Sequence, residues 1–216
     1  DKNTISGTNT DWIGFMNVLE NFAKKYGRPM MLPKEKYNLE KYGPNHEKTK
    51  YLKAFKHDTA VVVGYGGAGK AVVYSLVQMG FRRIKVFNRT LEKIKNIETS
   101  IVKPFKLEEL LNHTLRSSVT INTIPNPNIL GELGVSHNNY DQVVDYYNVG
   151  ADFNYKTINK VGTGLFNEHF FYAHRIHGIH MLVSQAAPCF ERWYGVLPEF
   201  NDPELSSKLL KIIKNK

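Results

Sequence analysis

Apolar residues recur every three or four positions along residues 11–25, which is the spacing of one face of an α-helix. The members of this stripe are Trp12, Phe15, Met16, Leu19 and Phe22. Asn9, Thr10 and Asp11 come just before it, and residues of these types cap helix starts. The pattern predicts an amphipathic helix. Two more helices are predicted near the end of the chain, at about 177–194 and 203–214.

From Thr59 the pattern changes to a short β-branched run. Residues 60–63 read AVVV, which is typical of a strand buried on both faces. A glycine-rich turn from Gly64 to Gly69 follows, then apolar residues at helical spacing as far as Gly80, and then a second apolar segment at 84–87. This order predicts a βαβ unit with parallel strands.

Weaker patterns continue the alternation of strand and helix. We expect helices near 91–99 and 107–112, and strands at 119–123 and 143–147. Together they predict an α/β fold, a doubly wound parallel sheet with helices on both faces that binds its ligand at the carboxyl ends of the strands. Residues 12–216 would form this domain, with an insertion rich in Gly, Pro and Lys at about 26–57.

The composition is that of a globular protein, with 42% hydrophobic and 23% charged residues. No apolar run approaches the length of a membrane span, and no short apolar leader opens the chain. The lone cysteine, Cys189, agrees with a reducing compartment. We therefore expect a cytoplasmic protein that does not interact with membranes.

The net charge of +9 raises nucleic acid as a partner. Residues 24–57, however, hold ten basic and three acidic side chains, so most of the excess is local. This distribution argues against nucleic-acid binding. A solvated insertion is the simpler interpretation, and a docking surface for an acidic partner is the alternative.

The glycine turn carries the first chemical signal. Its spacing is Gly64-x-Gly66-x-x-Gly69, and it lies between a buried strand and a helix. At such a turn the backbone amides and the positive end of the helix face a diphosphate, and missing side chains let the diphosphate approach closely. The motif therefore predicts a bound dinucleotide.

The end of the second strand indicates which dinucleotide is bound. An acidic residue there would bond the ribose 2′-hydroxyl and repel a 2′-phosphate. The sequence has Asn88, Arg89 and Thr90 instead, with Lys93 one turn further on. Because a guanidinium binds phosphate in a bidentate manner and a lysine adds charge, the favoured cofactor is NADP. The alternative is that Arg89 is a solvated capping residue.

Three further segments join these two motifs in order along the chain. They are GTNTDWIG at 7–14, INTIP at 121–125 and GIHMLVSQAA at 178–187. Together the five segments resemble the shikimate dehydrogenase family, whose motifs are G-x-N-T-D, G-x-G-G-A, N-R-T, I-N-x-T-P and G-x-x-M-L-V-x-Q-A-A. The resemblance covers mainly the NADP-binding lobe of that family, a Rossmann-type domain.

The resemblance implies an oxidoreductase of aromatic amino acid biosynthesis that reduces 3-dehydroshikimate to shikimate with NADPH. It implies that Asp11 is catalytic, by orienting a proton donor, and that Gln185 and Tyr147 bind this small-molecule substrate. A plain capping role is the alternative for Asp11. The implied cofactor-binding residues are Gly64, Gly66, Gly67, Ala68, Asn88, Arg89, Thr90, Lys93, Asn122, Gly178 and Met181.

The chain departs from the family's pattern in three places. The substrate lobe with its catalytic Lys is largely absent, since only residues 1–11 match its end and the connecting strand; we expect that lobe upstream in a longer protein. His180 stands where the family has a Gly, and Ile124 replaces a Thr. These departures leave open a catalytically silent NADP-binding regulatory relative and a quinate dehydrogenase.

Three histidines raise the question of a metal site. His174, His177 and His180 are spaced three apart, as zinc ligands on one helical face can be. His180 overlaps the motif that contacts the cofactor in the family that the chain resembles. We therefore predict no metal site.

Overall fold

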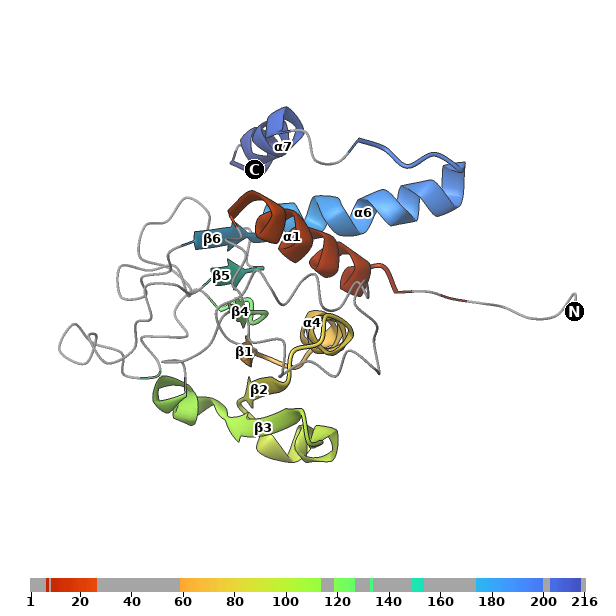
Figure 1. Ribbon diagram of the computed structural model, residues 1–216. Helices are drawn as coiled ribbons and strands as arrows, with labels where there is room; N and C mark the ends of the chain where they lie inside the picture. The colour runs from red at the N-terminus through yellow and green to blue at the C-terminus, as the bar shows by residue number, and fades with distance from the viewer. Residues whose placement is uncertain are drawn as a thin grey trace, which may run out of the picture.

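One parallel sheet organises the chain (Figure 1). The computed structural model describes residues 7, 9–26, 59–113, 119–126, 133, 149–153, 174–199 and 203–214. Within them the strands are β1 (Thr59–Val63), β2 (Arg83–Asn88), β3 (Val102–Lys106), β4 (Val119–Asn122), β5 (Val149–Asp152) and β6 (His174–His177). The α-helices are α1 (Asp11–Tyr26), α4 (Gly67–Gln78), α6 (Gly178–Tyr194) and α7 (Pro203–Lys214).

The strand order is β3-β2-β1-β4-β5-β6, and every neighbouring pair is parallel. Successive strands proceed from β1 toward one edge and from β4 toward the other, so the topological switch point lies between β1 and β4. All carboxyl ends therefore lie along the same side of the sheet. The predicted α/β fold is confirmed.

The core explains why residues 60–63 of β1 are all apolar. On one face of the sheet Ala60 and Val62 join a large cluster with side chains of α1, α4 and α6. On the other face Val61 and Val63 pack with Phe87, Leu107 and Leu110. All five residues of β1 are buried, and the one polar residue among them, Thr59 at its start, accepts a hydrogen bond from the Arg83 side chain at 2.9 Å.

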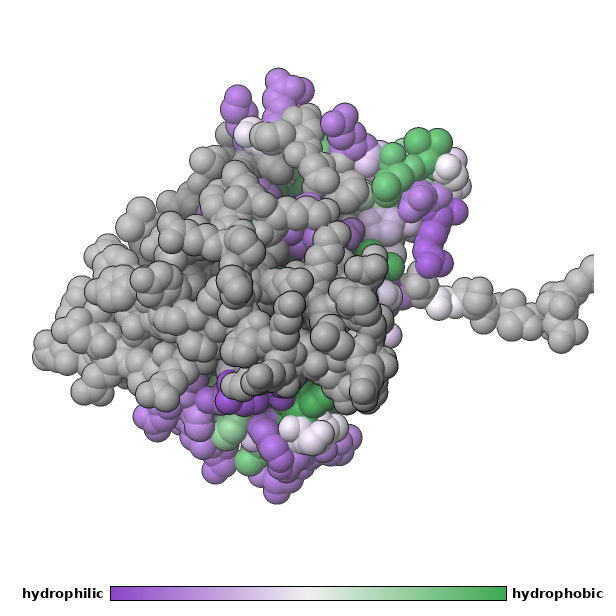
Figure 2. Space-filling view, in the orientation of Figure 1, coloured by the Kyte–Doolittle hydropathy of each residue, from purple (hydrophilic) through white to green (hydrophobic). Residues whose placement is uncertain are grey.

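Helix α1 lies beside α6, which extends from the end of β6 (Figure 1). The far end of α6 is apolar at the surface: Phe190, Val196 and Leu197 are exposed, and Figure 2 shows hydrophobic residues gathered there. Of the helices in the described part of the chain, none combines the length and hydrophobicity needed to cross a membrane.

The helix expected near 107–112 is present as a 3₁₀ helix, whereas the single helix expected near 91–99 is replaced by two short turns. These segments form short 3₁₀ helices, η2 (Leu91–Lys93), η3 (Lys95–Ile97) and η4 (Leu107–Asn112). In the first segment the Thr99 hydroxyl accepts the N–H groups of Ile101 and Val102 at 3.2 and 2.9 Å, which turns the chain into β3. Segments this short gain too few hydrogen bonds to sustain an α-helix.

Three strands were not predicted. β3 contains Pro104, which disfavours strands in general but is tolerated here because β3 is an edge strand. β5 (VGAD) and β6 (HRIH) contain few of the β-branched and aromatic residues that favour strands. The strand predicted at 143–147 and the insertion predicted at 26–57, apart from Tyr26, lie outside the described residues.

Candidate functional site

The glycine turn begins where β1 ends. Gly64 has a φ of +94°, a conformation that glycine adopts without strain. Its N–H donates to the carbonyl oxygen of Phe87 at 2.7 Å, and a Cβ at this position would lie 2.6 Å from the Thr123 hydroxyl oxygen. Both the backbone conformation and the close neighbour therefore require glycine here.

The remaining glycines of the turn have two different roles. A Cβ on Gly69 would collide with the carbonyl oxygen of Gly64, so this glycine lets α4 begin directly against the strand. Gly66 and Gly67 are exposed, and a Cβ on either would meet nothing within 4 Å. Two glycines thus serve the fold, and two leave bare backbone next to open space.

The first turn of α4 suits an anion. The first four N–H groups of a helix have no partner within the helix, and the helix dipole is positive at this end. Gly66 is the N-cap, and in this described helix no side chain bonds the cap and no acidic residue occupies the first turn. The open surface at Gly66 and Gly67 therefore coincides with a positive electrostatic potential.

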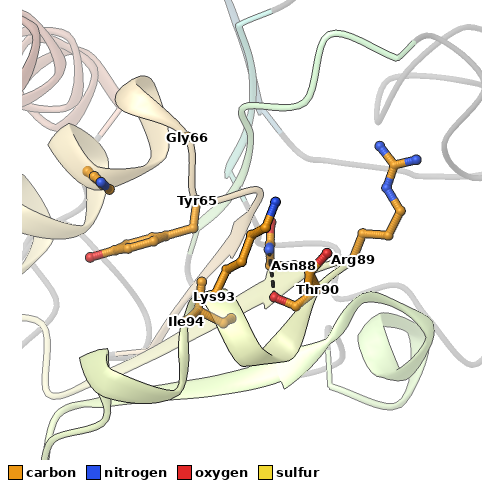
Figure 3. A pocket seen from close by; sticks show the side chains of 8 residues that line it. Tyr65, Gly66, Asn88, Arg89, Thr90, Lys93 and Ile94 are labelled. Atoms are coloured by element: carbon orange, nitrogen blue, oxygen red, sulfur yellow. Dashed lines mark hydrogen bonds between the residues drawn. The ribbon is translucent and has the colours of Figure 1, made fainter.

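A pocket of about 670 Å³ lies between this turn and the end of β2 (Figure 3). Pockets of this size commonly hold small ligands and cofactors. The lining residues are Tyr65, Gly66, Lys70, Asn88, Arg89, Thr90, Lys93 and Ile94. Three of these eight are cationic and none is acidic, so the pocket favours an anionic ligand.

Hydrogen bonds fix the backbone around two of these cations, Arg89 and Lys93, at the end of β2. The Asn88 side chain donates to the carbonyl oxygen of Thr90 at 3.0 Å, and the Lys93 N–H donates to the same oxygen at 3.3 Å. Figure 3 shows Lys93 and Arg89 extending on either side of Asn88, with Lys93 on the side of Tyr65. The structure thus brings together Gly66, the Asn-Arg-Thr motif and Lys93, as the sequence predicted.

Three lining residues were missed by the sequence analysis: Tyr65, Lys70 and Ile94. Tyr65 stands between the first two glycines of the motif, and Lys70 comes one turn after Gly66, so their positions in the motif could have indicated them. Burial raises the pKa of Tyr65, which packs against the main core and walls the pocket as a neutral phenol.

Other predicted cofactor residues lie at the ends of β4 and β6, and they are buried. The Asn122 amide group donates to the carbonyl oxygen of Ile124 and to an Asp152 carboxylate oxygen, both at 3.2 Å, and its oxygen accepts the Ile124 N–H at 3.0 Å. With no exposed surface, Asn122 shapes the loop after β4. Its influence on a cofactor stays a prediction.

Gly178 and Met181 lie in the first turn of α6, and both are packed against other parts of the protein. A Cβ on Gly178 would lie 2.6 Å from the carbonyl oxygen of Phe153, which follows β5, so glycine allows the helix to start against that strand. Met181 is 5% exposed and belongs to the main core. A contact between Met181 and a nicotinamide ring stays a prediction.

The predicted catalytic residue lies at the junction of α1 and α6. Asp11 is the first residue of α1, and its N–H donates to the Asn9 side chain at 2.7 Å. One turn later, a Cβ on Gly14 would lie 2.6 Å from the backbone nitrogen of Gln185, and Thr10 lies 3.0 Å from the Cys189 sulfur. The packing therefore brings the start of α1 against the segment of α6 that holds Gln185.

Tyr147 lies outside the described residues. Among those described, the predicted site residues fall into two groups: those near the pocket between β1 and β2, and those at the ends of β4 and β6 and in the adjoining helices α6 and α1. The first group is open and cationic, whereas the second is closely packed.

Comparison with known proteins agrees with this arrangement. The family model of shikimate / quinate 5-dehydrogenase matches residues 47–138. The NADP(+) shikimate dehydrogenase of Thermotoga maritima is 32% identical over 117 residues, which are 54% of this chain and 33% of that protein. The NADP(+) shikimate dehydrogenase of Buchnera aphidicola is 27% identical over 210 residues, covering 93% of this chain and 61% of its own length.

Among solved structures, the shikimate dehydrogenase of Thermotoga maritima superimposes with a TM-score of 0.56 at 26% identity, covering 95% of this chain and 64% of that one. The chain thus spans between a third and two thirds of the lengths of these relatives. The resemblance predicted from the five motifs is confirmed: the chain is similar to the shikimate and quinate 5-dehydrogenases in sequence and in fold.

Proposed function

We propose that this chain is the NADP-binding part of an oxidoreductase of the shikimate dehydrogenase type, which reduces 3-dehydroshikimate to shikimate. Residues 12–216 would form the cofactor domain, and residues 1–11 would connect it to a substrate lobe. The observation that carries the proposal is the pocket between β1 and β2, because bare glycine backbone and three cations face the same space there.

The pocket fits NADP in charge and in shape. Gly66 and Gly67 leave room for a diphosphate beside the first turn of α4, where any side chain would project into that space. Arg89 and Lys93 lie at the end of β2, where a ribose 2′-phosphate would need positive charge. The names of the relatives from Thermotoga maritima and Buchnera aphidicola include NADP(+), which supports the same choice.

When bound, NADPH supplies a hydride for reduction of a ketone. Negative charge then develops on the ketone oxygen, so a proton donor must lie within hydrogen-bond reach. We assign Asp11 to orient that donor, since a carboxylate at the start of α1 can accept hydrogen bonds from it. Gln185, which packs against α1, and Tyr147 would bind substrate hydroxyls.

Cofactor titration tests the proposal most directly. We expect NADPH to bind the 216-residue chain more tightly than NADH, as followed by the fluorescence of the reduced nicotinamide. Arg89→Ala should weaken NADPH binding by about 1.5 to 3 kcal/mol, which is typical of a charged hydrogen bond. The affinity for NADH should be nearly unchanged. Equal dissociation constants for the two cofactors would contradict the assignment to NADP.

Activity is tested in a protein that also carries the substrate lobe. NADP-dependent oxidation of shikimate should then be measurable, with quinate compared as the alternative substrate. Asp11→Asn should lower kcat far more than it weakens NADPH binding, and Gln185→Ala should mainly raise KM. A protein that binds NADPH yet oxidises neither compound would support the catalytically silent alternative instead.

The isolated chain provides the complementary experiment. The resemblance assigns the proton-donating Lys to a substrate lobe that these 216 residues do not include, so we expect NADPH binding without turnover. Robust shikimate oxidation by this chain alone would refute the two-lobe account. His180, which is exposed at the start of α6, would then be the first proton donor to test by substitution.

A further inference from the structure

We propose that Lys70, which no motif singled out, binds the diphosphate that NADPH and NADH share. This inference rests on the proposed cofactor and assigns the three cations of the pocket to two different anionic groups. Lys70 would act on both cofactors alike, whereas Arg89 and Lys93 would act on the 2′-phosphate that only NADPH carries.

Lys70 comes from the same wall of the pocket as the bare glycines. Its backbone N–H donates to the carbonyl oxygen of Gly66 at 2.9 Å, so it lies one helical turn after the point where a diphosphate has open space. The side chain is exposed and lines the pocket. Its charge therefore adds to the positive end of α4, and both attract an anion at the same place.

Arg89 and Lys93 come from the other wall, at the end of β2. In Figure 3 they flank Asn88 across the pocket from Gly66. The nearby Glu92 does not line the pocket and pairs with Lys95 at 3.9 Å. Positive charge thus reaches the pocket from two opposite sides, which fits a ligand with two separated anionic groups.

Two fragments of the cofactor separate these roles. ADP carries the diphosphate without a 2′-phosphate, and 2′-AMP carries a 2′-phosphate without the diphosphate. We expect Lys70→Gln to lower the affinity for ADP about tenfold and to leave the affinity for 2′-AMP unchanged. Arg89→Gln should lower the affinity for 2′-AMP about tenfold and leave the affinity for ADP unchanged. Binding is measured by displacement of NADPH fluorescence from the 216-residue chain.

Two controls accompany these variants. Lys95→Gln removes an exposed lysine outside the pocket and should change neither affinity. Lys70→Arg keeps the charge and should retain the affinity for ADP. Circular dichroism checks that each variant is folded. Added salt should reduce the difference in ADP affinity between the wild type and Lys70→Gln, because salt screens exposed charges.

The possible results are distinct. If Lys70→Gln weakens only 2′-AMP, or neither fragment, the assignment of Lys70 to the diphosphate is overturned while NADPH binding stands. If the wild-type chain binds neither NADPH nor either fragment, the proposed function fails and the inference fails with it. Loss of ADP affinity that Lys70→Arg restores supports the inference.

Discussion

Two regions on the carboxyl side of the sheet use glycine in opposite ways. Beside β1 and β2, Gly66 and Gly67 face open space. Around β6 and α6, a Cβ on Gly178 or Gly14 would lie 2.6 Å from the backbone of Phe153 or Gln185. In the first region Gly66 and Gly67 therefore leave an open surface, although Gly64 and Gly69 beside them are closely packed. In the second region both glycines allow close contact between elements.

The polar and apolar motif residues follow the same division. Lys70, Arg89 and Lys93 are exposed around the pocket. Asn122 and Met181 are buried. The Asn122 amide donates a hydrogen bond to Asp152, and Met181 packs in the main core. Substitutions should therefore change ligand affinity in the first region and the free energy of unfolding in the second.

The largest effect is expected at Gly178. In Gly178→Ala the new Cβ would collide with the Phe153 backbone, and either α6 or the end of β5 must move. We expect the free energy of unfolding to fall by about 3 kcal/mol, as measured by urea denaturation. Gly67→Ala places a Cβ in open space and is the matched control, which should not be destabilised. Equal denaturation midpoints for the two variants would contradict the claim that Gly178 is closely packed and Gly67 is not.

Gly66→Val tests the open region in the same way. The backbone φ of Gly66 is −76°, and its Cβ would meet no neighbour, so the circular dichroism spectrum and Tm should be unchanged. NADPH affinity should fall by about a hundredfold or more, because the side chain occupies the space that a diphosphate needs. Affinity retained by the folded variant would show that the turn does not bind the cofactor.

Asn122→Ala should lower stability with little effect on the pocket. The substitution removes three hydrogen bonds at the end of β4, including the one to the buried Asp152, and should cost about 1 to 3 kcal/mol of unfolding free energy. ADP affinity should stay near that of wild type, since Asn122 does not line the pocket. Asn112→Ala, at an exposed position, is the control. A selective loss of ADP affinity would argue that the two regions are coupled.

The smallest effect concerns His113, on the face of the sheet opposite α4. Its ring lies 4.4 Å from that of Phe105, and its Nδ1 lies 3.4 Å from the Lys85 ammonium. Burial and the Lys85 charge lower the pKa of His113 below its ordinary 6.5, an effect that Glu109 partly offsets.

The unfolded chain therefore binds a proton at His113 more readily than the folded protein does. This contribution to stability is present above pH 6.5 and is lost as the pH falls from there through the lower folded pKa. Urea denaturation at about pH 7.5 and pH 5.5 should show that His113→Gln reduces the pH dependence of stability. Lys85→Met should reduce it by less, since burial remains. An identical pH dependence in wild type and His113→Gln would contradict this account.

The sequence predicted the first region almost completely. β1, the glycine turn, α4 and β2 follow one another in the chain, so each neighbour constrains the next within about 30 residues. The β-branched run requires burial on both faces, and the glycines require a tight turn before a helix. The charge at Arg89 and Lys93 then falls at the strand end by connectivity alone, which is why local pattern was sufficient there.

In the second region the sequence indicated residues but not their roles. Gly178, Asn122 and Gln185 stand in recognisable motifs, yet their contacts join segments far apart in the chain: Gly178 to Phe153, Asn122 to Asp152 and Gln185 to Gly14. β3 was missed because it contains a proline, and β5 and β6 because few of their residues favour strands; these strands exist through pairing with a neighbour.

The sequence by itself therefore determined the βαβ unit, the glycine turn and the positive charge beside it, since these depend on contiguous residues and backbone geometry. Only the tertiary structure decided which motif residues are exposed to a ligand, that Lys70 and Tyr65 share a pocket with Arg89, and that α1 packs against α6 at Gln185. Those outcomes depend on the order of strands in the sheet and on close packing between distant segments, and neither is encoded in local spacing.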